Sequence, residues 1–286
     1  MIIKKRYWNI AKRLSTVQLQ KESSDQPDFS ESDLFNINIG QRGNSFFLGY
    51  YSYEGLKLVF EKYGIMRELA EKGFTNVILK VDTSDPYIHK LTLYDRFKKP
   101  DKVLVEVVLR RQMIEIQMPF KTPLNGRKYE VLSIEWMEMQ NPNGSFTKER
   151  PRLPGQHFPG LGMASKAIEL LMVTAWRLNL AGLLNTPQNY HNAYLYSRIF
   201  FYINPEDQAR LKAMKRDLGH WELARVAWAI ERGEVHDAIS GQILQWPASK
   251  QIVPLNTELK ALFNSRIYRK FVRERAKSFK FEFIEK

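Results

Sequence analysis

A short glycine-containing turn stands directly before the longest apolar helical segment of the chain. The turn and the start of the helix consist of Gly160, Leu161, Gly162, Met163, Ala164 and Ser165. Glycines at the start of a helix allow backbone N–H groups to approach a pyrophosphate, and the helix dipole adds positive potential at the same place. The turn is therefore a candidate cradle for a phosphorylated ligand. The alternative is an ordinary Pro-Gly turn before a buried helix, because a single Gly-x-Gly motif is common.

The residue types present exclude several other kinds of chemistry. The chain has no cysteine, which excludes disulfides, thiolate zinc sites, iron–sulfur clusters and cysteine nucleophiles. Its five histidines are His89, His157, His191, His220 and His236. No two of them are four residues apart, so a histidine metal site would need ligands from distant segments. We expect no metal, and the chemistry must come from other side chains or from a bound cofactor.

The composition indicates a packed protein with a strong positive charge. The 286 residues are 44% hydrophobic and 26% charged, which is sufficient for a sizeable core. Lys and Arg number 44 against 31 for Asp and Glu, so the formal net charge is +13. This excess favours an anionic partner, such as nucleic acid, a phosphorylated cofactor, an acidic carrier protein or a membrane surface. We find neither a membrane-spanning apolar run nor a signal-peptide pattern, and we expect a cytoplasmic protein.

A mixture of strands and helices must position the turn. Apolar segments predict strands at residues 45–51, 76–83, 89–94, 103–112, 129–139, 181–184 and 199–203. Helical spacing predicts helices at residues 4–20, 52–72 (one kinked helix or two short ones), 163–180, 187–197 and 206–236. Turn signals between the four strands from 76 to 139 predict an antiparallel meander, and helix 163–180 joins two strands that we expect to be parallel. The sequence predicts an α/β (α+β) fold with a mixed, mostly antiparallel, splayed sheet flanked by helices.

Three parts follow one another along the chain. Residues 1–40 combine a basic helix with a polar linker, residues 41–205 form the core, and residues 206–286 form a helical, basic C-terminal extension. The extension has an apolar stripe that needs a partner surface, so we expect it to pack on the core. Its tail at 266–280 holds seven Lys or Arg and one acid. An RNA surface, an acidic-protein surface and a solvated helix docked by its apolar stripe are the three interpretations of this tail. The alternation of Phe279, Phe281 and Phe283 predicts a strand.

Two segments resemble the GNAT superfamily of N-acetyltransferases. The first, Gly160–Lys166, is similar to the acyl-coenzyme A turn that follows the fourth strand in that superfamily. The second, in which Asn189, Leu195, Tyr196 and Phe201 agree in spacing, is similar to the superfamily's late pattern Asn-x-x-Ala-x-x-Leu-Tyr-x-x-x-Gly-Phe. By element order the resemblance covers roughly residues 45–205. It implies a GNAT-like fold and the transfer of an acyl group from acetyl-CoA or another acyl-CoA to an amine. The residues implied to bind the cofactor are Gly160, Leu161, Gly162, Met163, Ala164, Ser165 and Asn189.

The implied reaction requires one group that accepts a proton from the amine and another that returns a proton to the leaving thiolate. By the family's pattern, Tyr196 is the proton donor. Glu135 and Glu138 are candidates for the base, and their odd separation predicts that they point to opposite faces of a strand. We prefer Glu135 because its strand neighbours are apolar. His191 is a second candidate base, against the simpler interpretation that it decorates the start of a helix.

Two functions from different classes remain open. In the first, the chain is an acyl-CoA-dependent N-acyltransferase, with an acidic acyl carrier protein as an alternative acyl source. In the second, it is a catalytically inactive module of the same fold that binds an anionic partner, either nucleic acid or an acidic carrier protein. Pro159 and Phe200 favour the second, because the superfamily usually has Gln or Arg at the first position and glycine at the other. Nucleic-acid binding rests on charge alone at this point.

Overall fold

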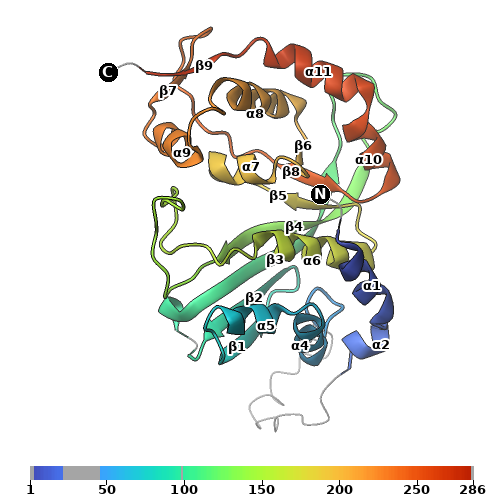
Figure 1. The fold of residues 1–286 in the computed structure, drawn as a ribbon. Coiled ribbons are helices and arrows are strands. Elements are labelled where there is room, and N and C mark those ends of the chain that lie inside the picture. Colours follow the sequence, from blue (N-terminus) through green and yellow to red (C-terminus); the bar gives the residue numbers. More distant parts are fainter. Residues whose placement is uncertain (1–2, 22–45, 98, 285–286) are drawn as a thin grey trace.

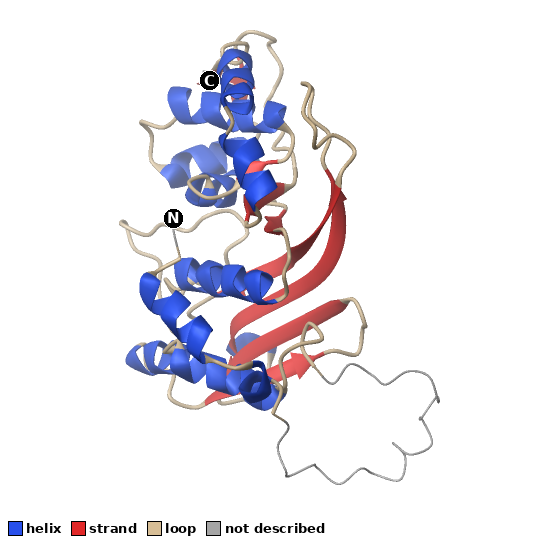
Figure 2. Cartoon of the chain, turned by 90° about the vertical axis from the view of Figure 1, so that its right-hand side faces the viewer, coloured by secondary structure: helices blue, strands red, loops and turns tan. Residues whose placement is uncertain are grey.

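A seven-stranded sheet forms the centre of the molecule in the computed structural model, which describes residues 3–21, 46–97 and 99–284. The strand order is β1-β2-β3-β4-β5-β8-β6 (Figure 1). The strands of this sheet are β1 (Val77–Asp82), β2 (Ile88–Asp95), β3 (Val103–Glu115), β4 (Lys128–Met139), β5 (Gly182–Asn185), β6 (Phe201–Tyr202) and β8 (Gln251–Pro254). Figure 2 shows most of the helices on one side of the long strands. The expected mixed, mostly antiparallel sheet flanked by helices is confirmed.

The helices are distributed along the whole described chain. They are α1 (Lys5–Arg13), α2 (Thr16–Leu19), α4 (Tyr53–Lys62), α5 (Ile65–Glu71), α6 (Ala164–Arg177), α7 (Tyr190–Tyr196), α8 (Pro205–Asp217), α9 (Leu223–Glu231), α10 (Thr257–Asn264), α11 (Arg266–Ala276) and the 3-10 turn η1 (Pro100–Lys102). None of the helices in the described ranges is long and apolar enough to cross a membrane. A small second sheet pairs β7 (Val235–Asp237) with β9 (Phe281–Phe283). The strand predicted by the alternating phenylalanines is therefore confirmed.

The strands that lead to the glycine turn pair as the sequence predicts. β1 to β4 form an antiparallel meander. β4 and β5 pair in parallel, with Leu132, Ser133 and Ile134 opposite Leu183, Leu184 and Asn185. Among the strand pairs of the described residues this is the only parallel one. The helix α6 makes the crossover between these two strands, as a parallel connection requires.

The prediction of one helix over residues 4–20 is wrong, because the segment contains two helices. Leu14 has an extended backbone and ends α1. The Ser15 side chain then accepts a hydrogen bond from the backbone of Gln18, while the Gln18 side chain accepts one from the Ser15 backbone. This reciprocal capping box starts α2 as a new helix. The predicted linker after Lys21 lies outside the described residues.

The prediction of a strand over residues 45–51 is also wrong. Phe47 and Tyr51 bridge to each other across a tight turn. Leu48 and Gly49 in this turn have left-handed φ angles of 56° and 68°. The apolar side chains that suggested a strand are buried here by the turn, since Phe47, Leu48 and Tyr51 are each 4% exposed. Residue 45 lies outside the described residues.

Glycines with a left-handed backbone end helices in two of the longer predicted helical segments. Gly64, with φ +70°, separates α4 from α5, which selects the interpretation of two short helices for 52–72. The segment 206–236 contains α8 and α9, and α9 ends before Gly233, whose φ is +68°. His236 lies in β7 and not in a helix. Left-handed backbone is easiest for glycine, so these positions stop a helix that side-chain periodicity alone would continue.

The C-terminal segment supplies a strand of the central sheet. β8 lies between β5 and β6 and pairs antiparallel with both. The short strand β6 therefore contacts β8 and not β5. The segment that begins at residue 206 packs on the core and also contributes β8 to the central sheet. Residues 206–286 are therefore part of the same folded unit as the sheet.

Two apolar clusters lie on either side of β5. In the first cluster, the helices α1, α2, α4, α5 and α6 pack on the meander. In the second cluster, the helices from α7 through α11 pack on one end of β3 and of β4. Leu183 belongs to the first and its neighbour Leu184 to the second, and both are almost fully buried. Adjacent residues of a strand point to opposite faces, so β5 forms the wall between the clusters.

Candidate functional site

A β-bulge lies in β4 directly after the last residue of β4 that pairs with β5. Val108 on β3 lies opposite Trp136, whereas the next residue, Leu109, lies opposite Ile134. Glu135 is therefore an extra residue in β4, and the extra residue of a bulge falls outside the ladder of paired residues. Pairing between β4 and β5 ends at Ile134, directly before this bulge. No pattern in the sequence indicates this bulge, because it depends on the register between two strands.

The glycine turn is held at the end of β4 although a long loop separates the two in sequence. The loop at 141–159 closes on itself, because the Asn141 N–H donates to the Pro159 carbonyl at 2.7 Å. Gln140 and Gly160 form an isolated antiparallel β-bridge, and the Leu161 N–H donates to the Met139 carbonyl at 3.3 Å. The turn therefore lies directly beside the end of β4 in space, although the loop separates the two in sequence.

The turn presents an open backbone at the start of α6. Gly162 has φ +74°, and a Cβ placed on it would meet no atom within 4 Å. The side chains of Leu161 and Met163 are buried and anchor the turn, so only their backbone groups can meet a ligand. No side chain caps the helix, and its first turn contains no acidic residue. The exposed N-terminus of a 14-residue helix next to an open glycine backbone suits an anion such as a pyrophosphate.

The two candidate glutamates point toward the same face of the sheet and not to opposite faces. Glu138 lies opposite Glu106 on β3. The Glu135 carboxylate lies 3.4 Å from the Arg110 guanidinium. Glu106 and Arg110 share a face because they are four residues apart on one strand. The expectation from sequence parity fails because the bulge at Glu135 resets the alternation of β4.

Glu138 has the environment of a proton acceptor. Its side chain is half-buried and faces Glu106, whose carboxylate binds the Lys90 ammonium at 2.5 Å. Burial and the nearby charge of Glu106 raise the pKa of Glu138, while His157 lowers it. Glu135, by contrast, is exposed and paired with Arg110. The structure thus favours Glu138 over the glutamate preferred from sequence.

Tyr196 lies at the end of α7 and is half-buried against the first apolar cluster. Its ring centroid is 6.1 Å from that of Phe200. Burial raises the pKa of the Tyr196 phenol, so the hydroxyl stays protonated at neutral pH. Asn189, at the start of α7, lies against the closed loop, because a Cβ on Gly155 would meet its Nδ2 at 3.5 Å.

His191 is a core residue and not a surface base. The residue is 3% exposed, and its Nδ1 has no hydrogen-bond partner among the described residues. Burial lowers the pKa of His191 to about 4. A buried imidazole that is neutral at pH 7 and hard to protonate is a poor general base, which corrects the expectation from sequence.

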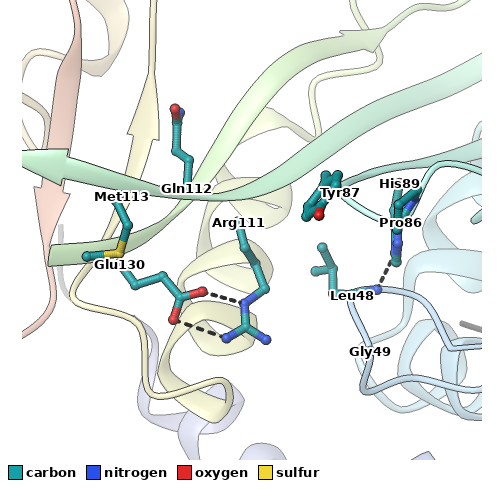
Figure 3. A pocket seen from close by; sticks show the side chains of 9 residues that line it. All are labelled: Leu48, Gly49, Pro86, Tyr87, His89, Arg111, Gln112, Met113 and Glu130. Atoms are coloured by element: carbon teal, nitrogen blue, oxygen red, sulfur yellow. Dashed lines mark hydrogen bonds and ion pairs between the residues drawn. The ribbon is translucent and has the colours of Figure 1, made fainter.

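A separate cavity of about 340 Å³ lies at the other end of β4 (Figure 3). Its lining residues are Leu48, Gly49, Pro86, Tyr87, His89, Arg111, Gln112, Met113 and Glu130. Arg111 donates two hydrogen bonds to the Glu130 carboxylate, at 2.9 and 3.1 Å. The Leu48 N–H donates to Nδ1 of His89 at 2.6 Å. None of the site residues predicted from sequence lines this cavity.

Comparison with known proteins gives matches to solved structures alone, at low sequence identity and low TM-score. No protein-family model matches the chain, and no curated protein matches it. Among solved structures, it is similar to "AtaT complexed with acetyl-methionyl-tRNAfMet" (13% identity, covering 74% of this chain and 88% of that chain, TM-score 0.29). It is also similar to "The crystal structure of KacTA-DNA complex" (13%, 52% and 72%, TM-score 0.27) and to "Crystal structure of AtaTR bound with AcCoA" (16%, 56% and 78%, TM-score 0.23).

Burial of His191 predicts a specific pH dependence of stability. An unfolded histidine titrates near pH 6.5, so the unfolded chain gains this proton as the pH falls from about 6.5 to about 4, while the folded chain does not. The free energy of unfolding should decrease across that window, by at most about 3 kcal/mol from this residue. His191→Phe should flatten the dependence in urea melts at several pH values. The control His220→Phe, at an exposed histidine, should not; an equal slope in both variants would contradict the assignment.

Proposed function

We propose that the chain is a divergent member of the GNAT superfamily that binds an acyl-CoA at the glycine turn and transfers its acyl group to an amine. One observation carries the proposal: the open turn at Gly160–Ala164 is hydrogen-bonded to the end of β4, just beyond the bulge at which β4 leaves β5. The open backbone of the turn and the point where β4 and β5 stop pairing therefore belong to one candidate site. The cytoplasmic location expected from the sequence is part of this proposal.

The chain's own residues fit such a ligand. The backbone N–H groups of Gly160 and of Gly162 to Ser165 would hold the pyrophosphate, and the net charge of +13 favours a polyphosphate ligand in general. Asn189 would join them by releasing its contact with Gly155. When bound, an acyl-CoA supplies an activated carbonyl carbon and a thiolate leaving group.

Two side chains would move the protons of this reaction. Glu138 accepts a proton from the amine as the new C–N bond forms. Tyr196 donates its phenolic proton to sulfur as the C–S bond breaks. Backbone N–H groups at the bulge would donate hydrogen bonds to the carbonyl oxygen, where negative charge develops. Glu135 is the alternative base, as the sequence first indicated.

The second candidate function is a catalytically inactive module of the same fold. Phe200 favours it, because its ring is buried and lies next to Tyr196, where the superfamily usually has a glycine. Such a module would bind nucleic acid or an acidic carrier protein and no acyl-CoA. An acidic acyl carrier protein as acyl donor stays within the first proposal.

Substitution of Gly162 tests the cradle. Gly162→Asp places a negative charge where a phosphate must approach, and aspartate tolerates a left-handed backbone. We expect the affinity for acetyl-CoA and for longer acyl-CoA thioesters to fall by about tenfold or more, measured by thermal-shift titration near about 1 mM ligand. Gly126→Asp is the matched control, since Gly126 has φ +80° and open space but lies in a distant turn. No shift with any thioester in the parent chain would favour the inactive module.

The two glutamates can be distinguished by turnover and by its pH profile. Glu138→Gln should lower turnover by about 10²–10⁴-fold, and Glu135→Gln should lower it far less. Glu106→Gln should move the acidic limb of the profile to lower pH, because the like charge that raises the pKa of Glu138 is gone. His157→Gln should move it the opposite way. If Glu135→Gln produces the larger loss and Glu106→Gln leaves the limb in place, the base is Glu135.

Tyr196→Phe isolates the proton donor. The substitution keeps the ring and its packing and removes only the hydroxyl, so acyl-CoA affinity should stay nearly unchanged. Turnover should fall by at least about tenfold. Tyr194→Phe, on the same helix, serves as the control for a lost phenol. Full turnover in the Tyr196 variant would remove this residue from the mechanism.

A further inference from the structure

The helix α11 carries a row of exposed positive charge that is only partly neutralised. Its exposed cationic residues are Arg266, Arg269, Lys270, Arg273, Arg275 and Lys277. The helix contains one acid, Glu274, which binds Arg273 and Lys277. Arg266, Arg269 and Lys270 have no acidic partner among the described residues, and Arg269 donates only to the Asn264 amide oxygen.

The acidic side chains of the surrounding elements already form ion pairs with Lys or Arg residues. Glu206 on α8 binds Arg275, and Glu258 on α10 binds Arg127. Asp217 binds Arg216, and Glu282 binds Lys280. The neighbouring turn between β3 and β4 adds the exposed Lys121, because the adjacent Phe120 packs on Phe271 of α11 with ring centroids 5.9 Å apart. The positive potential of this surface is therefore not cancelled locally.

The helix α11 packs against the protein along its inner side and exposes its outer side to solvent. Tyr268, Val272 and Ala276 are buried on its inner side. The Tyr268 hydroxyl donates to the Tyr202 carbonyl at 2.8 Å, and Ser265 caps the start of the helix. Figure 1 shows α11 along the outer edge of the molecule beside α8 and α10. The helix is docked by its apolar stripe, and the charged face is held in a fixed position.

The shape of this surface decides which polyanion fits it. The major groove of B-form DNA admits a whole helix, which requires a helix that projects from the protein. α11 instead does not project, because Tyr268, Val272 and Ala276 are buried on its inner side, and its open face carries no exposed aromatic residue for stacking on single-stranded bases. A-form RNA has a wide, shallow minor groove bordered by phosphates, which the basic face of a docked helix can contact.

We propose that the exposed face of α11, with Arg266, Arg269, Lys270 and the adjacent Lys121, is a docking surface for double-helical RNA. The contacts are to phosphates and independent of base sequence. This binding does not require an acyl-CoA. A chain that binds RNA but no thioester would overturn the proposed function and leave this proposal standing.

The test is the salt dependence of binding to a fluorescein-labelled RNA hairpin, measured by anisotropy on the full chain. Each lost phosphate contact lowers the slope of log K against log salt by about 0.7–0.9. The triple variant Arg266→Gln/Arg269→Gln/Lys270→Gln should lower the slope by about two to three. The matched control is Lys5→Gln/Lys12→Gln/Arg13→Gln on α1, which removes the same charge from another basic helix at exposed positions. This control should change the slope by less than about one.

Several results would overturn the proposal. Equal loss in the two triple variants would show that net charge, and not α11, drives binding. Tighter binding of a DNA duplex of the same sequence would exclude the commitment to RNA. Equal competition by polyglutamate would indicate an acidic protein partner. Absence of RNA binding at low salt would end the proposal, and unchanged melting temperatures of both variants show that each variant is folded.

Discussion

β4 and β5 pair in parallel over Leu132–Ile134 and Leu183–Asn185, the Ala181 N–H donates to the Glu130 carbonyl before them, and the arrangement of the site depends on this short contact. A longer parallel pairing would close the sheet at this point. The pairing stops where β5 ends at Asn185 and directly before the bulge at Glu135, whose extra residue bends β4 and breaks the ladder. The same bulge turns Glu135 and Glu138 to one face, so this register shift sets the placement of the carboxylates at the end of the β4–β5 pairing.

The glycine turn depends on the same strand. The hydrogen bonds from Asn141 to Pro159 and from Leu161 to Met139 fix the turn to the end of β4. The loop between them is thereby free to differ in length without moving the turn. Gly155 of this loop lies beside the Asn189 side chain, which brings the loop to the start of α7, the helix that ends at Tyr196.

Much of the fold was predictable because it follows from local periodicity. The meander, the crossover helix and the parallel β4–β5 pair were all expected from turn signals and from apolar spacing. The bulge was not, because it is a relation between β3 and β4 that no single segment encodes. Strand β8 was not predicted, because its place between β5 and β6 depends on pairing with segments distant in sequence. The environment of Glu138 depends on the cross-strand neighbour Glu106, and His191 was misjudged because burial is decided by elements distant in sequence.

The position of β8 also bears on how the molecule is made. The Leu255 and Asn256 N–H groups donate to the Ala181 carbonyl, so the end of β8 is tied to the start of β5 across more than 70 residues of chain. Such distant pairings form late, since the loop between them must be closed first. During synthesis, β5 keeps an unpaired edge until residue 254 has left the ribosome. A nascent chain that stops earlier exposes Leu184 and its neighbours, which makes it a substrate for chaperones or for aggregation.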